Sequence, residues 1–243
     1  MKHIYFLLCL FLFAGCNQNN KNKNDASLKD TSKNTGWYRK KNGKGNLVLE
    51  MYFKNGLQEG SSKSFYDDGK LRYDVIYKGG KREGTAIWYY GNGVTIYETI
   101  EYKNDKKNGT AKKYYKNGKL KSVLSYKDDQ PGIGLKEYDE KGKEIAGGCP
   151  FIIIKEKRIP NKIILLIALD NESENVEFYQ GELTDNVYMN KKLFPIFTQH
   201  GKGKIVYSFS KFTGIIRKIN IIAKVITSQN NIYVTQSSYK INF

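Results

Sequence analysis

The chain has 243 residues, of which 40% are hydrophobic and 14% aromatic, and its formal net charge is +17. This is enough apolar material to fill one or two cores, which excludes a chain that is disordered throughout. Nineteen Tyr and 12 Phe against four Pro favour β-structure over helix, because aromatic side chains suit a pleated, half-buried surface. The basic excess fits an anionic partner or a solubilising surface, and the three cysteines suggest no disulfide framework.

The first predicted element in chain order is an apolar segment. Lys2 precedes an apolar run from Ile4 to Ala14, which as a helix would be only about 16 Å long, roughly half a bilayer core. We therefore expect residues 1–15 to be a signal peptide rather than a membrane span. The segment ends in FAGC, which resembles the lipobox of bacterial lipoproteins.

The lipobox resemblance implies that Cys16 is acylated and holds the protein in the cell envelope. Because no acidic residue directly follows Cys16, the expected location is the periplasmic face of the outer membrane, as in similar lipoproteins. An ordinary secretory signal with an incidental cysteine is the alternative. Residues 16–35 contain almost nothing that can be buried, so we expect a flexible tether with a reach of about 25 Å.

A repeat begins after the tether. The glycines that open each unit, Gly36, Gly60, Gly84 and Gly109, are 24, 24 and 25 residues apart. An aromatic-Lys pair closes each unit, with spacings of 24, 25 and 24 residues, at Phe53, Tyr77, Tyr102 and Tyr126. A period this regular is typical of stacked supersecondary units.

Each unit has the pattern of one β-hairpin. Two large residues precede a turn written DDG, GNG or KNG, and Asn-Gly and Asp-Gly supply the positive φ angles that tight hairpins need. In the strand after the turn, alternate residues are apolar, which aims them at one face: Leu47, Met51 and Phe53; Leu71, Val75 and Tyr77; Ile96, Ile100 and Tyr102; Leu120, Leu124 and Tyr126. We expect an antiparallel meander of hairpins over residues 36–145, in which the last unit is a terminal cap.

The pattern aromatic-x-x-Gly-Lys-Leu followed by Tyr-Lys-x-Gly-Lys-x-x-Gly resembles the variant MORN repeats of the bacterial YwqK-type antitoxin family. The resemblance implies the repeat fold. Antitoxin action would be an analogy only, because an exported, lipid-anchored protein could not neutralise a cytoplasmic toxin.

A candidate binding surface follows from the paired large residues before each turn. Neighbours in a strand point to opposite faces, so if Tyr66, Tyr90 and Tyr115 face the core, their partners form a ladder on the other face. The ladder consists of Phe65, Tyr89 and Tyr114, flanked by Lys63, Lys112 and Lys136. It could bind a partner, or it could pack against the second domain or merely against cross-strand neighbours.

The repeat stops near Gly147, and residues 146–243 are predicted to form a small β-sandwich, with the immunoglobulin type as one candidate. The predicted strands number five to seven, with these clear segments: Lys162–Asp170, Val176–Leu183, Lys204–Ser210, Ile215–Thr227 and Ile232–Phe243. The fold class is thus all-β, a hairpin-repeat meander followed by a small sandwich.

Catalytic residues are hard to find. His200 is the one histidine outside the signal segment, and its TQHGKGK context predicts a loop. The acidic pairs Asp67-Asp68, Asp128-Asp129 and Asp139-Glu140 occupy turn positions, and Cys149 is more plausible as a small buried hydrophobe than as a nucleophile. We expect no catalytic residue, no metal and no cofactor.

The sequence therefore predicts a non-enzymatic, lipid-anchored envelope protein that serves binding or assembly. The expected partner is an envelope protein or an anionic polymer, not nucleic acid, and the lipid on Cys16 supplies the membrane contact. The alternatives are a binder of anionic cell-wall polymer or of a lipid surface, an antitoxin-like protein, and a cryptic enzyme acting on glycan or peptide.

Overall fold

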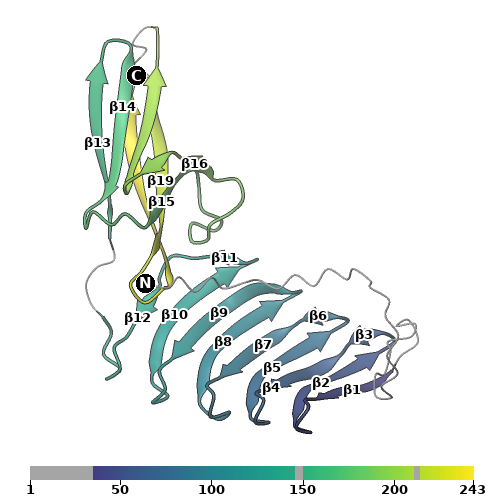
Figure 1. Ribbon diagram of the computed structural model, residues 1–243. Coiled ribbons are helices and arrows are strands. Elements are labelled where there is room, and N and C mark those ends of the chain that lie inside the picture. The colour runs from purple at the N-terminus through teal and green to yellow at the C-terminus, as the bar shows by residue number, and fades with distance from the viewer. Residues whose placement is uncertain (1–34, 146–149, 211–213) are drawn as a thin grey trace, which may run out of the picture.

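The computed structural model describes residues 35–145, 150–210 and 214–243. All regular elements within these ranges are strands, in one twelve-stranded sheet and two four-stranded sheets (Figure 1), which confirms the all-β prediction. The described part of the chain has no helix that is long and apolar enough to cross a membrane. Cys16, Cys149, the predicted signal peptide and nearly all of the predicted tether lie outside the described residues.

The large sheet is an antiparallel meander in which neighbours in sequence are neighbours in space, as predicted. Two-residue strands beside the connections pair with the longer strands. Its strands are β1 (Gly36–Lys41), β2 (Leu47–Lys54), β3 (Leu57–Gln58), β4 (Gly60–Phe65), β5 (Leu71–Lys78), β6 (Lys81–Arg82), β7 (Gly84–Tyr89), β8 (Ile96–Lys103), β9 (Lys106–Tyr114), β10 (Leu120–Lys127), β11 (Gln130–Pro131) and β12 (Lys136–Glu137).

The repeated glycine and the repeated aromatic are cross-strand partners. Gly60 is opposite Tyr77, Gly84 opposite Tyr102 and Gly109 opposite Tyr126. These glycines have φ angles of 76°, 83° and 114°, a region that other residues enter only with strain. An aromatic side chain opposite a glycine can cover the backbone that the glycine leaves bare. The repeated glycine and the repeated aromatic therefore act as a pair.

Successive units are also tied together by tyrosine hydroxyl groups. Tyr66 donates to the backbone oxygen of Tyr89 at 2.8 Å, and Tyr90 does the same to Tyr114 at 2.7 Å. Tyr115 donates to Tyr138 at 2.7 Å, which carries the pattern into the terminal unit. These tyrosines are half-buried, and their hydroxyl groups bond to the neighbouring unit rather than to solvent.

The two-residue connections between units carry a further set of links. Asp128 and Asp129 have φ angles of 49° and 68°, as a type I′ turn requires. The Asp129 carboxylate accepts a hydrogen bond from the Lys107 backbone at 2.8 Å, and Asp105 accepts one from the Arg82 backbone at 2.9 Å. The acidic pair Asp128-Asp129 therefore occupies turn positions, as predicted.

The remaining strands form two sheets of four, ordered β13-β14-β18-β17 and β16-β15-β19-β20, and the sandwich lies beyond the β10–β12 end of the large sheet (Figure 1). Eight strands exceed the predicted five to seven. They are β13 (Ile152–Ile159), β14 (Lys162–Leu169), β15 (Val176–Gln180), β16 (Phe194–Ile196), β17 (Thr198–Gln199), β18 (Lys202–Ser208), β19 (Ile216–Ile226) and β20 (Ile232–Asn242).

The sandwich core is formed by the facing sides of its two sheets. Ile163, Leu165 and Ile167 of β14 meet Phe178 of β15 and Ile221 of β19, and all five are at most 1% exposed. The sandwich thus has the larger core of the two parts, because its two layers can bury side chains between them.

A polar cluster joins the sandwich to the last strands of the large sheet. Asn231, only 6% exposed, donates to the Glu137 carboxylate at 2.6 Å and accepts from the Lys113 ammonium group at 2.8 Å. Thr227 donates to the same Glu137 oxygen at 2.7 Å. The β19–β20 turn therefore docks on the end of the repeat.

We predict that Tyr90→Phe lowers the free energy of unfolding by about 1 kcal/mol, the net value of one hydrogen bond. Thermal unfolding followed by circular dichroism would measure this. The matched control is Tyr97→Phe, since the Tyr97 hydroxyl makes no hydrogen bond within the described residues and the side chain is 40% exposed. Equal stabilities of the two variants would contradict a role for the hydroxyl links.

We also predict that Asn231→Ala costs about 1–3 kcal/mol, because Glu137 and Lys113 each lose a buried partner. The same unfolding measurement applies. Gln236→Ala, an exposed change on the same strand β20, is the control and should change stability by less than about 0.5 kcal/mol. A variant Asn231→Ala as stable as that control would show that the polar cluster contributes nothing to stability.

Candidate binding surface of the repeat sheet

The large sheet is a single layer, so its two faces can be compared directly. Val75, Ala86, Ile100 and Ala111 are buried on one face, which we call the tyrosine face because Tyr73, Tyr77 and Tyr126 pack on them. The predicted ladder and its lysines belong to the opposite face, which we call the ladder face. The register shows this for the lysines: Lys63 is opposite Asp74, while Lys112 and Lys136 are both opposite Val123.

The ladder aromatics occupy equivalent places in three successive units. Each sits where the register slips by one residue, so that Phe65 pairs with Leu71, Tyr89 with Ile96 and Tyr114 with Leu120. All three aromatic side chains are half-buried. Burial raises the pKa of Tyr89, with a smaller contribution from the Asp74 carboxylate.

The sandwich contacts both faces of the large sheet, but only at its β10–β12 end. On the tyrosine face Asn231 contacts Lys113 and Ser122, and on the ladder face Asp185 pairs with Lys127. Over the described residues, no hydrogen bond or ion pair joins the sandwich to a side chain of the ladder. Packing of the ladder against the second domain, one alternative drawn from the sequence, is therefore not what the structure has. The ladder packs on neighbours within its own sheet.

Carboxylates lie near two of the three lysines that flank the ladder. Lys63 lies 4.0 Å from Asp74, and Lys136 lies 3.7 Å from Glu144. Lys112 is exposed and has no ion pair in the described part of the chain. The lysines that flank the ladder therefore contribute less free positive charge than their number suggests, which weakens the case for an anionic polymer bound at the ladder itself.

The tyrosine face contains a row of side chains that crosses six strands. Successive cross-strand partners in this row are Tyr73, Trp88, Glu98, Lys113, Ser122 and Glu137. The rings of Tyr73 and Trp88 are 4.5 Å apart. Beside this row, the Arg82 guanidinium lies 4.2 Å from the centre of the Tyr102 ring, so a basic side chain of the protein itself occupies that aromatic surface.

Glu98 is the unusual member of the row. Its carboxylate makes no hydrogen bond and no ion pair within 4.0 Å to any described residue, although the side chain is half-buried. Burial raises the pKa of Glu98 above the ordinary 4.5, and the opposing effects of Lys113 and Lys107 do not cancel this. Burial likewise lowers the pKa of Lys113 despite the attraction of Glu98.

Sequence reasoning missed this residue and the junction residue Asn231. Glu98 has the same parity as Ile96, Ile100 and Tyr102, so the alternation could have identified a carboxylate on the apolar face. No local signal indicates that Asn231 meets Lys113, because the contact joins residues 118 positions apart.

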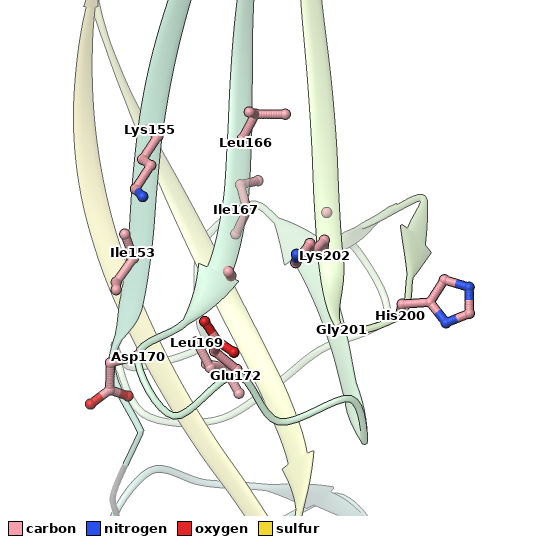
Figure 2. Close-up of a pocket in the computed structure, with 12 residues that line it drawn as sticks. Ile153, Lys155, Leu166, Ile167, Leu169, Asp170, Glu172, His200, Gly201 and Lys202 are labelled. Carbon is pink, nitrogen blue, oxygen red and sulfur yellow. The ribbon is translucent and has the colours of Figure 1, made fainter.

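A cavity of about 310 Å³ lies at one end of the outer surface of β14, where His200, Asp170 and Glu172 line it together with β13 and β18 (Figure 2). His200 is in a loop, as predicted, and its ring points away from the two carboxylates. The Asp170 carboxylate accepts a hydrogen bond from the Phe151 backbone at 2.9 Å. Over the described residues there is no group of three or more His, Cys, Asp and Glu side chains placed to hold a metal ion.

We predict that Glu98→Gln makes the protein more stable at pH 7. Since the folded-state pKa of Glu98 is raised, the wild type loses stability as the pH rises through the interval that begins near 4.5. The advantage of the variant should therefore be greatest above that interval and vanish below it. Denaturant unfolding at a series of pH values would measure it, and Glu101→Gln, an exposed change on the same strand, controls for the lost charge.

Comparison with known proteins identifies the repeat. Three consecutive segments, residues 58–78, 82–104 and 107–128, match the MORN repeat variant family. No curated protein matches the chain. The first hairpin, β1–β2, lies outside the matched segments but pairs Gly36 with Phe53 in the same register as the later units. The chain therefore contains a run of variant MORN repeats, which indicates a repeat-based binding module.

Proposed function

We propose that this protein is a lipid-anchored component of the bacterial cell envelope, in which the repeat sheet is a non-enzymatic platform that binds another envelope protein. The supporting observation is that Phe65, Tyr89 and Tyr114 recur at equivalent register positions on a sheet face that the sandwich contacts only at the β10 end, through Lys127. A row of half-buried rings with polar neighbours can supply the apolar centre of a protein interface.

Two further observations support the proposal. Variant MORN repeats indicate a binding module, and carboxylates lie within 4.0 Å of two of the three lysines that flank the ladder. Mixed charge of this kind suits a protein surface better than a polymer of uniform charge. The membrane location rests on the resemblance of FAGC to a lipobox, with acylation at Cys16.

We predict that Phe65→Ala/Tyr89→Ala/Tyr114→Ala abolishes crosslinking to the partner in intact cells, because the apolar centre of the interface is removed. Affinity purification and mass spectrometry of crosslinked cells would identify the partner. The matched control removes three exposed rings from the sandwich, Phe151→Ala/Phe194→Ala/Phe197→Ala, and should leave the partner in place.

A loss of folding would mimic a loss of binding, so a second variant is needed. Lys63→Glu/Lys112→Glu changes the charge of the ladder face without removing a ring, and it should weaken crosslinking at least about tenfold. An unchanged partner list in both ladder variants would refute the platform. The anchor is tested separately by mass spectrometry, which should find acyl chains on Cys16 of the wild type and none on a Cys16→Ser variant, whatever the ladder binds.

A further inference from the structure

The two sheets of the sandwich differ in how their outer faces are covered. Residues between β15 and β16 fold over the sheet that contains β19 and β20, where Leu183, Met189 and Leu193 cover Ile222 and Val234. All five side chains are buried. Among residues 35–145, 150–210 and 214–243, no such segment covers the outer face of the sheet that contains β13, β14 and β18.

The uncovered face has apolar side chains along its middle. Ile163, Leu165 and Ile167 of β14 point into the core, so Ile164, Leu166 and Ala168 point outward. The register places Val206 of β18 beside Ile164. Leu166 and Val206 are each 46% exposed, which is high for aliphatic side chains in the interior of two neighbouring strands.

Lysines flank this apolar strip on both sides. Leu166 lies between Lys155 of β13 and Lys204 of β18, and Ile164 lies beside Lys157. Lys162 and Lys202 extend the pattern to the two ends of the strip, and all five lysines are exposed. None of the outward positions of β13, β14 and β18 carries Asp or Glu, in contrast to the ladder face.

The strip continues into the cavity of about 310 Å³ introduced above. Figure 2 shows Lys155 and Lys202 on either side of Ile167, with Asp170 and Glu172 at the lower end of the site. The lining of the cavity thus combines two ammonium groups, two carboxylates at its lower end and the apolar side chains of Ile153 and Leu166. The carboxylate-free part of the face is the strip with its flanking lysines, which complements a molecule that has an anionic group and an apolar part, such as a phospholipid.

We propose that this outer sheet face docks on the surface of an anionic lipid bilayer. Lysines interspersed with aliphatic side chains suit such a surface, because the ammonium groups reach the phosphates while the hydrocarbon stems lie on apolar material. A protein partner fits less well, since protein interfaces are depleted in lysine and enriched in arginine and aromatic residues. The outward positions of β13, β14 and β18 carry neither arginine nor an aromatic residue. The proposal rests on the membrane location proposed above, to which it adds a second, non-covalent contact.

The test separates the lipid contact from the acyl anchor. All samples carry Cys16→Ser in the full chain, and they are co-sedimented with vesicles of phosphatidylcholine alone or with about one-third phosphatidylglycerol. We expect binding to the anionic vesicles only, weakened at least about tenfold by Lys155→Glu/Lys204→Glu and by raised salt. Lys44→Glu/Lys116→Glu makes the same charge change at two exposed turns of the repeat sheet, outside the ladder, and should bind as the parent does.

Three outcomes would overturn the proposal. In the first, both charge-reversed pairs lose vesicle binding equally, which would mean that the overall charge of +17 attracts the vesicles. In the second, the protein binds no vesicles, or binds neutral and anionic vesicles equally, which would mean that the face has no anionic lipid partner. Binding of polyglutamate that depends on Lys155 and Lys204, without vesicle binding, would assign the face to an acidic protein. Failure of the anchor would appear instead as wild-type protein from cells that carries no acyl group on Cys16 by mass spectrometry, whatever the vesicle binding of the Cys16→Ser samples.

Discussion

The repeat sheet depends on one constraint, which is that a single layer has no second layer to bury its apolar side chains. The sheet meets this constraint by burying side chains along its own face. Small residues such as Ala86 and Ala111 let the neighbouring tyrosine rings lie over them, and each opening glycine lies opposite the aromatic of the following strand. The 24- to 25-residue period, the positive φ angles and the tyrosine content all follow from this requirement.

The same constraint explains which parts of the fold can be predicted. Hairpin turns, the parity of Val75 and Ile100 and the opening glycines are local or periodic signals, and the structure has them as expected. Strand β13 was not predicted, because its apolar residues Ile152–Ile154 are followed by charged ones that resemble a loop. β16 and β17 were missed for another reason: with three and two residues, they are too short to show alternation.

The proposed binding surfaces likewise combine features that local sequence signals predict with features that they do not. The ladder could be placed from parity alone, but its charge balance could not, since the approach of Lys136 to Glu144 depends on how the terminal unit turns. The outer face of the sandwich depends on the register across β13, β14 and β18 and on the lack of a covering segment among the described residues. The alternation of apolar residues gives a trace of the register. The lack of cover has no such signal, because the segment that covers the other sheet is an irregular stretch between β15 and β16.

The junction at Asn231 has a consequence for the length of the molecule. A hairpin unit can be added to the sheet without disturbing its ends, because the links between units are alike and each unit contacts mainly its neighbours. Two strand spacings correspond to about 10 Å, so the unit count sets the distance between β1 and the sandwich in steps of that size. Since the β19–β20 turn docks on the final unit, related chains with more or fewer repeats would hold the same sandwich at a different distance from β1.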